Sequence, residues 1–190
     1  MNNDNQRRAP ARMQLAMIAA LFLGPLVLAA WLYYGGSFTP SARSNHGLLL
    51  DPVVQLPDMH PALPGISERQ WLLVYANDSA CGEACVDALF ALRQSRLMLG
   101  NDMTRLTRVF LRGPGGADTV PAIEQDGGLE ILQDASLLLD LRSALPADTP
   151  GGGFFLIDPL GNLVMYFRPD LDPRAMVDDI KHLLKLSHIG

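Results

Sequence analysis

The sequence predicts an α/β domain, with a mixed sheet flanked by helices, preceded by one transmembrane helix. Three observations predict it: an uncharged apolar run near the N-terminus, short apolar strand-like runs alternating with helical patterns, and a strand–turn–strand pattern near the C-terminus. Alternation of strands and helices is typical of an α/β sheet, and a closing hairpin makes that sheet mixed. We expect a cytoplasmic segment (1–13), a transmembrane helix (14–34), a tether (35–50) and a folded extracytoplasmic domain (51–190).

The apolar run has the length of a membrane span. Residues 13–42 carry no charge, and about 20 apolar residues suffice to cross a hydrocarbon core of about 30 Å. Backbone groups cannot stay unpaired in lipid, so the segment must be helical, with a kink expected at Pro25. Arg7, Arg8 and Arg12 precede the run and place that end in the cytoplasm. The domain is therefore expected outside the inner (cytoplasmic) membrane.

A cleaved signal peptide is the alternative interpretation of this segment. Its apolar stretch is normally about 7–15 residues long and ends at a small-x-small site. Here the run is longer, and the bulky Trp31 directly follows Ala29 and Ala30. We favour the retained membrane anchor, and the domain is exported in either case.

The charge of the chain argues against nucleic acid as a partner. The formal net charge is −5, although the N-terminal segment is basic, so the domain itself is acidic. Contacts to phosphates need clustered Lys and Arg side chains. We therefore set nucleic-acid binding aside.

The elements of the domain follow an irregular, proline-punctuated approach segment. They are expected as strand 71–77, helix 82–99, strand 108–111, helix 129–145, hairpin 154–167 and a final helix to Ser187. In the first helix, an apolar face is expected from Val86, Leu89, Phe90, Leu92 and Leu97. In the last helix, Asp172 is the expected N-cap and Pro173 the first helical residue.

The chain has two cysteines, Cys81 and Cys85, just after the first strand and at the start of the first helix. Residues four apart inside a regular helix have Cβ atoms about 5–6 Å apart, whereas a disulfide needs about 3.8 Å. The pair can therefore form a bridge only if Cys81 lies at or before the first turn. Disulfides persist in an oxidising compartment, which an exported domain would occupy.

The position of the pair also favours reactivity. The positive end of a helix lowers the pKa of a nearby thiol, and the thiolate is both the nucleophile of disulfide exchange and a soft ligand for Cu(I). An inert structural disulfide is the alternative, although its closed loop would restrict the unfolded chain little. A structural zinc site is disfavoured, because two thiolates fall short of four ligands.

The order of elements with a cysteine pair at this place resembles the thioredoxin-like fold. Cys-x-x-x-Cys, the later run Phe155-Leu156-Ile157-Asp158-Pro159-x-Gly161 and the membrane anchor together resemble the Sco/SenC family. The resemblance covers roughly residues 50–187. It implies a membrane-tethered copper or thiol factor that assists assembly of the CuA centre of cytochrome c oxidase, with an oxidase subunit or another assembly factor as partner.

Two departures from the family pattern matter. Gly82 and Val86 replace prolines that follow the family's cysteines. The family's copper-binding histidine lies just before the hairpin strand, where this chain has Thr149-Pro150-Gly151-Gly152-Gly153, and no histidine stands between His60 and His182. A two-thiolate Cu(I) site on Cys81 and Cys85 remains conceivable, but the family's three-ligand site does not.

Two functional hypotheses result. In the first, Cys81 is the attacking thiol and Cys85 the resolving thiol of an exchange factor that reduces a partner's disulfide or carries Cu(I). In the second, the protein is a non-catalytic membrane-anchored scaffold with a structural Cys81–Cys85 disulfide. Asp158 is interpreted as a turn residue of the hairpin and not as a catalytic acid.

Overall fold

The computed structural model describes residues 4–35, 45–56, 63, 70–115, 127–150 and 152–187, with side chains described from residue 13 onward. The chain divides into two compact units, Met1–Ser44 and Asn45–Gly190. Each unit is described by itself.

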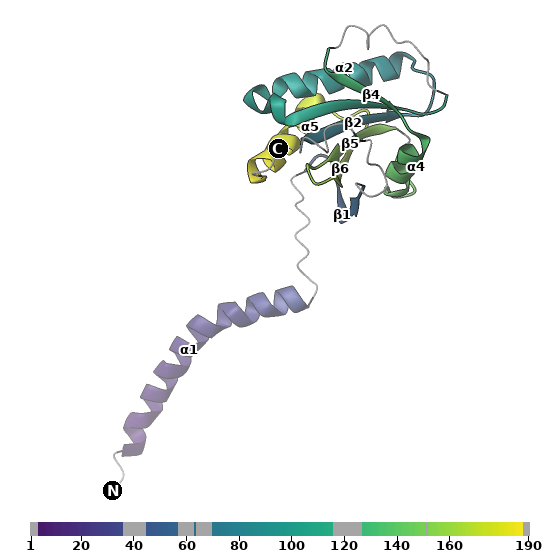
Figure 1. The fold of residues 1–190 in the computed structure, drawn as a ribbon. Coiled ribbons are helices and arrows are strands. Elements are labelled where there is room, and N and C mark those ends of the chain that lie inside the picture. The colour runs from purple at the N-terminus through teal and green to yellow at the C-terminus, as the bar shows by residue number, and fades with distance from the viewer. Residues whose placement is uncertain are drawn as a thin grey trace. The chain divides into compact units, whose positions relative to one another are not determined.

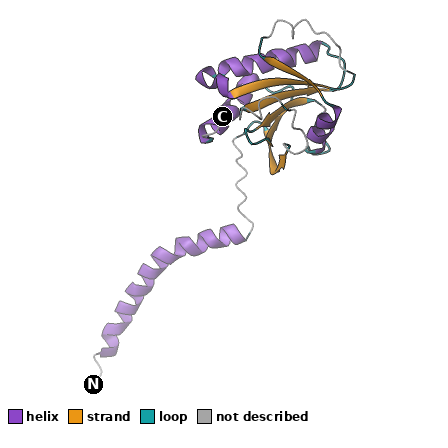
Figure 2. Cartoon of the chain, in the orientation of Figure 1, coloured by secondary structure: helices purple, strands orange, loops and turns teal. Residues whose placement is uncertain are grey.

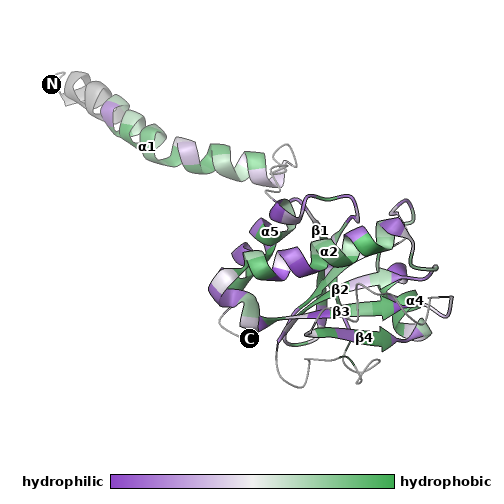
Figure 3. Cartoon of the chain, turned by 90° about the horizontal axis from the view of Figure 1, so that it is seen from above, coloured by the Kyte–Doolittle hydropathy of each residue, from purple (hydrophilic) through white to green (hydrophobic). Residues whose placement is uncertain are grey.

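The first unit contains one long helix, α1, from Asp4 to Tyr34. Its segment Met13–Tyr34 comprises 22 residues and is long and apolar enough to cross a membrane; at 1.5 Å per residue it spans about 33 Å. Hydrophobic residues dominate this segment (Figure 3), and its side chains are almost all exposed. The helix continues through Pro25 and curves along its length (Figure 1). An apolar helix of this length fits a single-pass membrane anchor.

The second unit is built on a six-stranded sheet with the order β1-β6-β5-β2-β3-β4. The strands are β1 (Leu48–Gln55), β2 (Trp71–Asn77), β3 (Leu106–Arg112), β4 (Leu129–Gln133), β5 (Gly153–Ile157) and β6 (Asn162–Phe167). β2, β3 and β4 run parallel to one another, whereas β5 and β6 form an antiparallel hairpin that joins β2 on one side and β1 on the other. The predicted mixed sheet is confirmed.

Helices cover both faces of the sheet (Figure 2). They are α2 (Glu83–Met98), the 3-10 helix η1 (Gly100–Arg105), α4 (Ala135–Ser143) and α5 (Pro173–Leu186). Along β2, Leu73 and Tyr75 join the core under α2 and α5, while Leu72 and Val74 join the core under α4. Burial on both sides explains why this strand is an uninterrupted apolar run instead of an alternating one.

The expected helix 129–145 is partly wrong. Its first residues form β4, which pairs in parallel with β3, and the helix α4 begins only after Asp134. The Asp134 side chain accepts hydrogen bonds from the backbone N–H groups of Ser136 and Leu137, which fixes the start of the helix. Short apolar runs cannot be divided between strand and helix by periodicity alone.

The expected end of the tether and its irregular continuation contain a strand, β1. It forms an edge of the sheet and pairs with β6, with an irregular register between Leu49 and Val54. Pro52 lies inside this interruption. A proline in a strand argues against a central position but is compatible with an edge or a bulge, which is where Pro52 is found.

The predicted apolar face of α2 is wrong in part. Leu89 and Leu92 are buried against the sheet, but Val86, Phe90 and Leu97 are 38%, 62% and 52% exposed. The buried side of the helix instead includes smaller residues (Cys85, Ala88, Ser95). The apolar residues of α2 therefore lie on two sides of the helix, and only one side faces the core.

Two local predictions at the C-terminal end are confirmed. Asp172 caps α5 by accepting a hydrogen bond from the backbone N–H of Arg174, and Pro173 is the first helical residue. Asp158 is a turn residue, because its carboxylate accepts hydrogen bonds from the backbone N–H groups of Leu160 and Asn162. These bonds close the β5–β6 hairpin.

Candidate functional site

A disulfide joins Cys81, in the connection between β2 and α2, to Cys85, in the first turn of α2, with 5.1 Å between the two Cα atoms. Gly82 is the N-cap of α2 in an extended conformation, so Cys81 lies before the helix and Cys85 lies in its first turn. The Cys85 N–H donates to the Gly82 carbonyl at 3.1 Å. This arrangement meets the condition that the spacing imposes, namely that Cys81 must stand outside the regular helix.

The two cysteines differ in exposure. Cys85 is 4% exposed and belongs to the core that also contains Tyr75, Leu89 and Phe110. Cys81 is partly exposed and packs against the edge of the same core. Solvent or a partner therefore reaches Cys81 more easily than Cys85.

The turn before Cys81 is held by specific contacts. Asn77, the last residue of β2, accepts hydrogen bonds from both the backbone N–H and the hydroxyl of Ser79. Asp78 forms an ion pair with Arg142 of α4 at 2.7 Å. A side chain at Gly113 would meet the Cα atom of Asp78 at 2.6 Å, so glycine lets the end of β3 approach this turn closely. These contacts fix the backbone that carries Cys81.

The N-terminus of α2 is open. Gly82 provides no capping side chain, in contrast to the aspartates that cap α4 and α5. A Cβ atom built on Gly82 would meet nothing within 4 Å among the described residues. The first N–H groups of a helix carry a partial positive charge that favours an anion such as a thiolate. The exposed Glu83 in the first turn adds a negative charge that opposes this effect.

The loop before β5 lies at the same end of the sheet as the disulfide, because Gly153 pairs with Ala76 near the end of β2. This loop is where the resemblance places a copper-binding histidine. Gly152 and Gly153 have φ angles of 80° and 129°, which L-residues rarely adopt. A Cβ atom at Gly153 would lie 2.7 Å from the Phe167 carbonyl oxygen. The backbone here is therefore built for glycine and does not accept a side chain.

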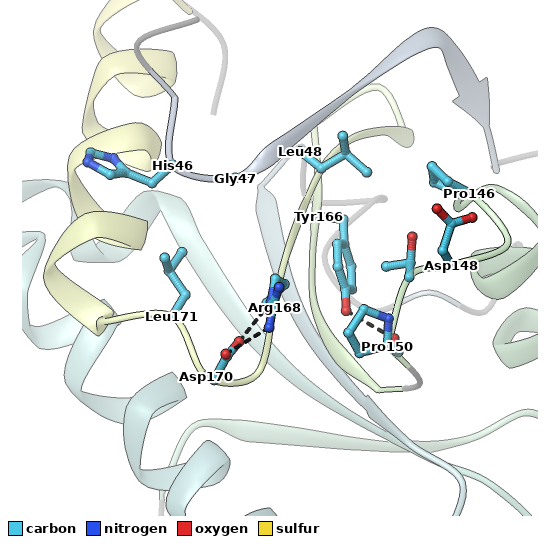
Figure 4. A pocket seen from close by; sticks show the side chains of 11 residues that line it. His46, Gly47, Leu48, Pro146, Asp148, Pro150, Tyr166, Arg168, Asp170 and Leu171 are labelled. Carbon is cyan, nitrogen blue, oxygen red and sulfur yellow. Dashed lines mark hydrogen bonds and ion pairs between the residues drawn. The ribbon is translucent and has the colours of Figure 1, made fainter.

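Tyr166 holds this loop from the neighbouring strand. Its hydroxyl lies 2.8 Å from the Gly152 carbonyl and 3.2 Å from the Pro150 carbonyl, and Figure 4 shows the ring directed toward Pro150. Burial raises the pKa of Tyr166, an effect that the charge of Arg168 partly opposes. The hydroxyl thus stays protonated and can donate to the loop at neutral pH.

A pocket of about 530 Å³ lies beside this loop (Figure 4). Arg168 in its wall donates two hydrogen bonds of 2.9 Å to the Asp170 carboxylate, and these bonds lower the pKa of Asp170. The guanidinium is therefore already engaged. Cys81 and Cys85 are not among the lining residues. The pocket is thus separate from the disulfide.

Neither of the two described histidines, His46 and His182, completes a metal site at the disulfide. His46 Nδ1 lies 3.1 Å from the Asp179 carboxylate, His182 is exposed on α5, and His60 lies outside the described residues. In the described parts of the chain, no group of three or more His, Cys, Asp or Glu side chains could hold a metal ion. Among the described residues, the donor set at Cys81 and Cys85 is therefore two sulfur atoms.

The sequence identifies the cysteine pair but not the long-range contacts that hold the domain together. Asp179 accepts hydrogen bonds of 2.8 Å from the backbone N–H groups of His46 and Gly47, far away in the sequence. No local pattern indicates such a contact. The glycine run before β5 was a visible signal, because consecutive glycines often mark positive φ angles or close backbone approach.

A mixed sheet with a disulfide at the start of the helix that follows a central strand defines a thioredoxin-like protein. The model of one protein family, described as a transmembrane-like, thioredoxin-like, C-terminal domain, matches residues 71–187. The chain belongs to this family. The fold class predicted from the sequence is therefore confirmed.

Several solved structures are similar to the chain. ScoI of Arabidopsis thaliana, solved with copper bound, shares 18% sequence identity over 63% of this chain and 86% of its own, with a TM-score of 0.49. ScoI of Bradyrhizobium japonicum, also solved with copper bound, shares 18% sequence identity over 62% of this chain and 88% of its own length, with a TM-score of 0.44. A SCO1/SenC family lipoprotein of Bacillus anthracis shares 14% sequence identity over 72% of this chain and 91% of its own length, with a TM-score of 0.46. The search of curated proteins finds no match.

The predicted resemblance to Sco/SenC proteins thus recurs among the solved structures. At this level of identity the likeness concerns the fold.

Proposed function

We propose that the protein is a membrane-anchored thiol–disulfide exchange factor whose domain acts on the extracytoplasmic side of the inner (cytoplasmic) membrane. The observation that carries the proposal is the asymmetric Cys81–Cys85 disulfide at the open N-terminus of α2. An accessible sulfur next to a helix N-terminus and a buried second sulfur are what an attacking and a resolving thiol require.

The proposed reaction transfers two electrons from the reduced cysteine pair to a partner. The Cys81 thiolate attacks one sulfur of the partner's disulfide, which forms a mixed disulfide and releases one partner thiolate. The Cys85 thiolate then attacks the Cys81 sulfur, which releases the second partner thiolate and forms the Cys81–Cys85 disulfide. Each released thiolate takes up a proton. The structure has the oxidised form, so a further dithiol reductant must regenerate the reduced pair.

The geometry favours this order of attack. Cys81 packs at the edge of the core and is followed by Gly82, near whose added Cβ no described residue lies within 4 Å, so a partner's backbone can approach these described parts without a clash. Cys85 is buried, and the nearest disulfide for its thiolate is the mixed disulfide on Cys81. The second step therefore proceeds within the protein and releases the partner.

For the client we propose the subunit of cytochrome c oxidase that carries the CuA centre, or another factor in its assembly. The support is the sequence resemblance to Sco/SenC proteins together with a helix fit for a membrane anchor. The same resemblance suggests Cu(I) as cargo on the two thiolates. The backbone at residues 152–153 has positive φ angles and no room for a Cβ at Gly153, which argues against a histidine ligand at these positions. We therefore propose thiol exchange as the main activity and expect any Cu(I) binding to be weak.

A trapping experiment tests the proposal. In cells expressing the full chain, Cys85→Ser removes the resolving thiol, so Cys81 should accumulate in mixed disulfides with its client after acid quenching and alkylation. Cys81→Ser is the matched control, because it keeps one buried thiol and should trap little. Mass spectrometry of the trapped species identifies the client.

A thiol-linked oxidase or assembly-factor partner that depends on Cys81 supports the proposal. Equal trapping by the two variants, or no trapping by either in membranes that contain both proteins, contradicts it and favours the scaffold hypothesis.

A further inference from the structure

The side of α2 that faces away from the sheet carries large apolar side chains. Val86, Phe90 and Leu97 are 38%, 62% and 52% exposed, whereas the buried residues of the helix lie on its other side. The three follow one another at intervals of four and seven residues, so they form one ridge along the helix. Single exposed apolar residues are ordinary on a protein, but a continuous row is typical of a binding surface.

This ridge begins at the redox site. Val86 directly follows Cys85, and its backbone N–H donates to the Gly82 carbonyl at 3.1 Å, so Val86 belongs to the first turn of α2. Phe90 lies about 6 Å farther along the helix axis. Helical side chains tilt toward the N-terminus of their helix, which brings the Phe90 ring toward Val86. The ridge therefore starts beside Gly82, the residue directly after Cys81.

Two carboxylates accompany the end of the ridge that lies nearest to Cys81. Glu83 and Asp87 are exposed, and each precedes an apolar residue of the ridge by three positions, which is the spacing of neighbours on a helix surface. Among the described residues, neither carboxylate has an ion-pair partner. The surface beside Cys81 is therefore both apolar and acidic.

The basic side chains around the site are already engaged. Arg142 is paired with Asp78 at 2.7 Å, so these two charges compensate each other. Arg112, which lies opposite Asn77 on β3, and Arg93, which lies one turn beyond Phe90, each have a contact of their own. Among the described residues, the uncompensated charge beside Cys81 is therefore negative, and it favours a cationic partner.

We propose that the ridge on α2 and its two carboxylates are the docking surface for the client of the redox site. They select a protein segment that carries a large apolar side chain and a lysine or arginine next to its disulfide. This inference rests on the proposed thiol exchange, because the mixed disulfide holds the client's sulfur about 2 Å from the sulfur of Cys81. An extended segment spans about 3.3 Å per residue, so the residues next to the client's cysteine reach Val86 and Phe90.

Model peptides with one cysteine test the selection, with the full chain fully reduced in nonionic detergent micelles. Each peptide carries thionitrobenzoate on its cysteine as a mixed disulfide. The Cys81 thiolate attacks the peptide's sulfur and releases the coloured thionitrobenzoate anion. The Cys85 thiolate then attacks the Cys81 sulfur, which forms the Cys81–Cys85 disulfide and releases the peptide thiolate, and this thiolate takes up a proton. Absorbance gives the second-order rate constant of the first step.

Three peptides that differ only next to their cysteine isolate the two features. The first has a leucine and a lysine there, the second a leucine and a glutamate, and the third a serine and a lysine. The first should react about fivefold faster than the second, as expected for exposed charges, and about fivefold faster than the third, as expected for a half-buried leucine. The preference for lysine should largely disappear in about 1 M salt, where charges are screened beyond about 3 Å.

Variants of the two carboxylates test the preference for charge. Glu83 also acts on the Cys81 thiolate, so the ratio between peptides is the measurement, and not the rate itself. Glu83→Gln and Asp87→Asn should each lower the lysine-to-glutamate ratio about twofold. Glu130→Gln is the matched control, because Glu130 is exposed on β4 and shares a face of the sheet with Leu132, which packs on the α4 side. It should leave the ratio unchanged.

A variant of the ridge tests the apolar preference. Phe90→Ser should lower the ratio between the leucine and serine peptides to about twofold or less, because the peptide's leucine loses its largest contact. Leu139→Ser is the matched control, because Leu139 is 64% exposed and lies on α4, on the other face of the sheet. It should keep the ratio of the unmodified chain. Both substitutions are at exposed positions, so both variants should fold.

The results separate this inference from the proposed function. Equal rates for the three peptides would overturn the docking surface while thiol exchange stands, whereas no release from any peptide would overturn both. Unchanged ratios in Phe90→Ser, together with a smaller protein–detergent particle, would overturn the inference and assign the ridge to a second copy of the chain. Ratios that depend on the detergent but not on Phe90 would also overturn it and assign the ridge to a lipid surface.

Discussion

Gly153→Ala should destabilise the domain strongly, and the structure gives the magnitude. The φ angle of Gly153 is 129°, and residues forced into such conformations cost about 1–3 kcal/mol. The added Cβ would lie 2.6 Å from Tyr166 Cε2 and 2.7 Å from the Phe167 carbonyl oxygen. Overpacking in a core costs a further 1–3 kcal/mol. We expect a total loss of about 2–6 kcal/mol from a stability of about 5–15 kcal/mol.

Neither neighbour of Gly153 can move freely. Phe167 pairs with Phe154 in the hairpin, so displacing its carbonyl disturbs the sheet. Rotating Tyr166 away sacrifices its hydrogen bonds to the carbonyls of Pro150 and Gly152. Gly153→His, the change that would imitate the Sco/SenC histidine most simply, should therefore unfold the domain before it creates a copper ligand.

Urea unfolding of the full chain in detergent measures the effect, with Trp71 fluorescence in a Trp31→Phe background as the signal. With a slope of about 2 kcal/mol per molar urea, the midpoint of Gly153→Ala should fall by about 1–3 M. Gly127→Ala is the matched control, because its Cβ would meet no described residue within 4 Å. It should stay within about 0.5 kcal/mol of the unmodified chain. A Gly153→Ala variant as stable as the Gly127→Ala control would refute the steric reasoning.

Three further predictions follow from other parts of the molecule. A reporter enzyme fused after Gly190 should be active only outside the cytoplasm, and a C-terminus protected from protease added to spheroplasts would contradict the predicted topology. Asp179→Ala removes the acceptor of three hydrogen bonds from His46 and Gly47, so it should lower the unfolding free energy by about 2–3 kcal/mol. It should also speed hydrogen exchange at the backbone amides of His46 and Gly47, and unchanged exchange at both amides would argue against this contact. Burial raises the pKa of Tyr166 above its ordinary value of 10.0, so stability should fall above pH 10, where the unfolded tyrosine ionises and the folded one does not; Tyr166→Phe should reduce this alkaline loss, and an unchanged loss would assign it elsewhere.

The central elements could be predicted because their signals are local. β2 is a continuous apolar run with polar ends. The hairpin is predicted by Asp158, Pro159 and Gly161, which lie between two apolar runs. The start of α5 follows from Asp172 and Pro173, whose capping chemistry depends on adjacent residues only. Local chemistry is therefore enough to predict these elements.

The edge strands could not be predicted, because their structure depends on partners far away. β1 contains a proline and gains its strand conformation from pairing with β6, more than 100 residues later. β4 resembles a helical segment until its pairing with β3 is known. The same reason hides the contact between Asp179 and the residues at 46–47. Long-range pairing overrode local pattern at each of these places.

At the candidate site, spacing alone set the main geometric requirement. Residues four apart in a regular helix have Cβ atoms too far apart for a disulfide, so Cys81 had to precede the helix. In the structure, Cys81 does lie before α2. The steric role of Gly153 was not accessible in the same way, because it arises from Tyr166 and Phe167 on a neighbouring strand.

The reduction potential of the Cys81–Cys85 pair tests the central claim most directly. The full chain in detergent is equilibrated with thiol–disulfide buffers of known potential, quenched with acid and alkylated, and the fraction reduced is read by mass, with Cys81→Ser as the control without a redox couple. An exchange factor should have a potential between about −270 and −120 mV, the range of known oxidoreductases. A potential below about −300 mV, typical of structural disulfides, would contradict the proposed function.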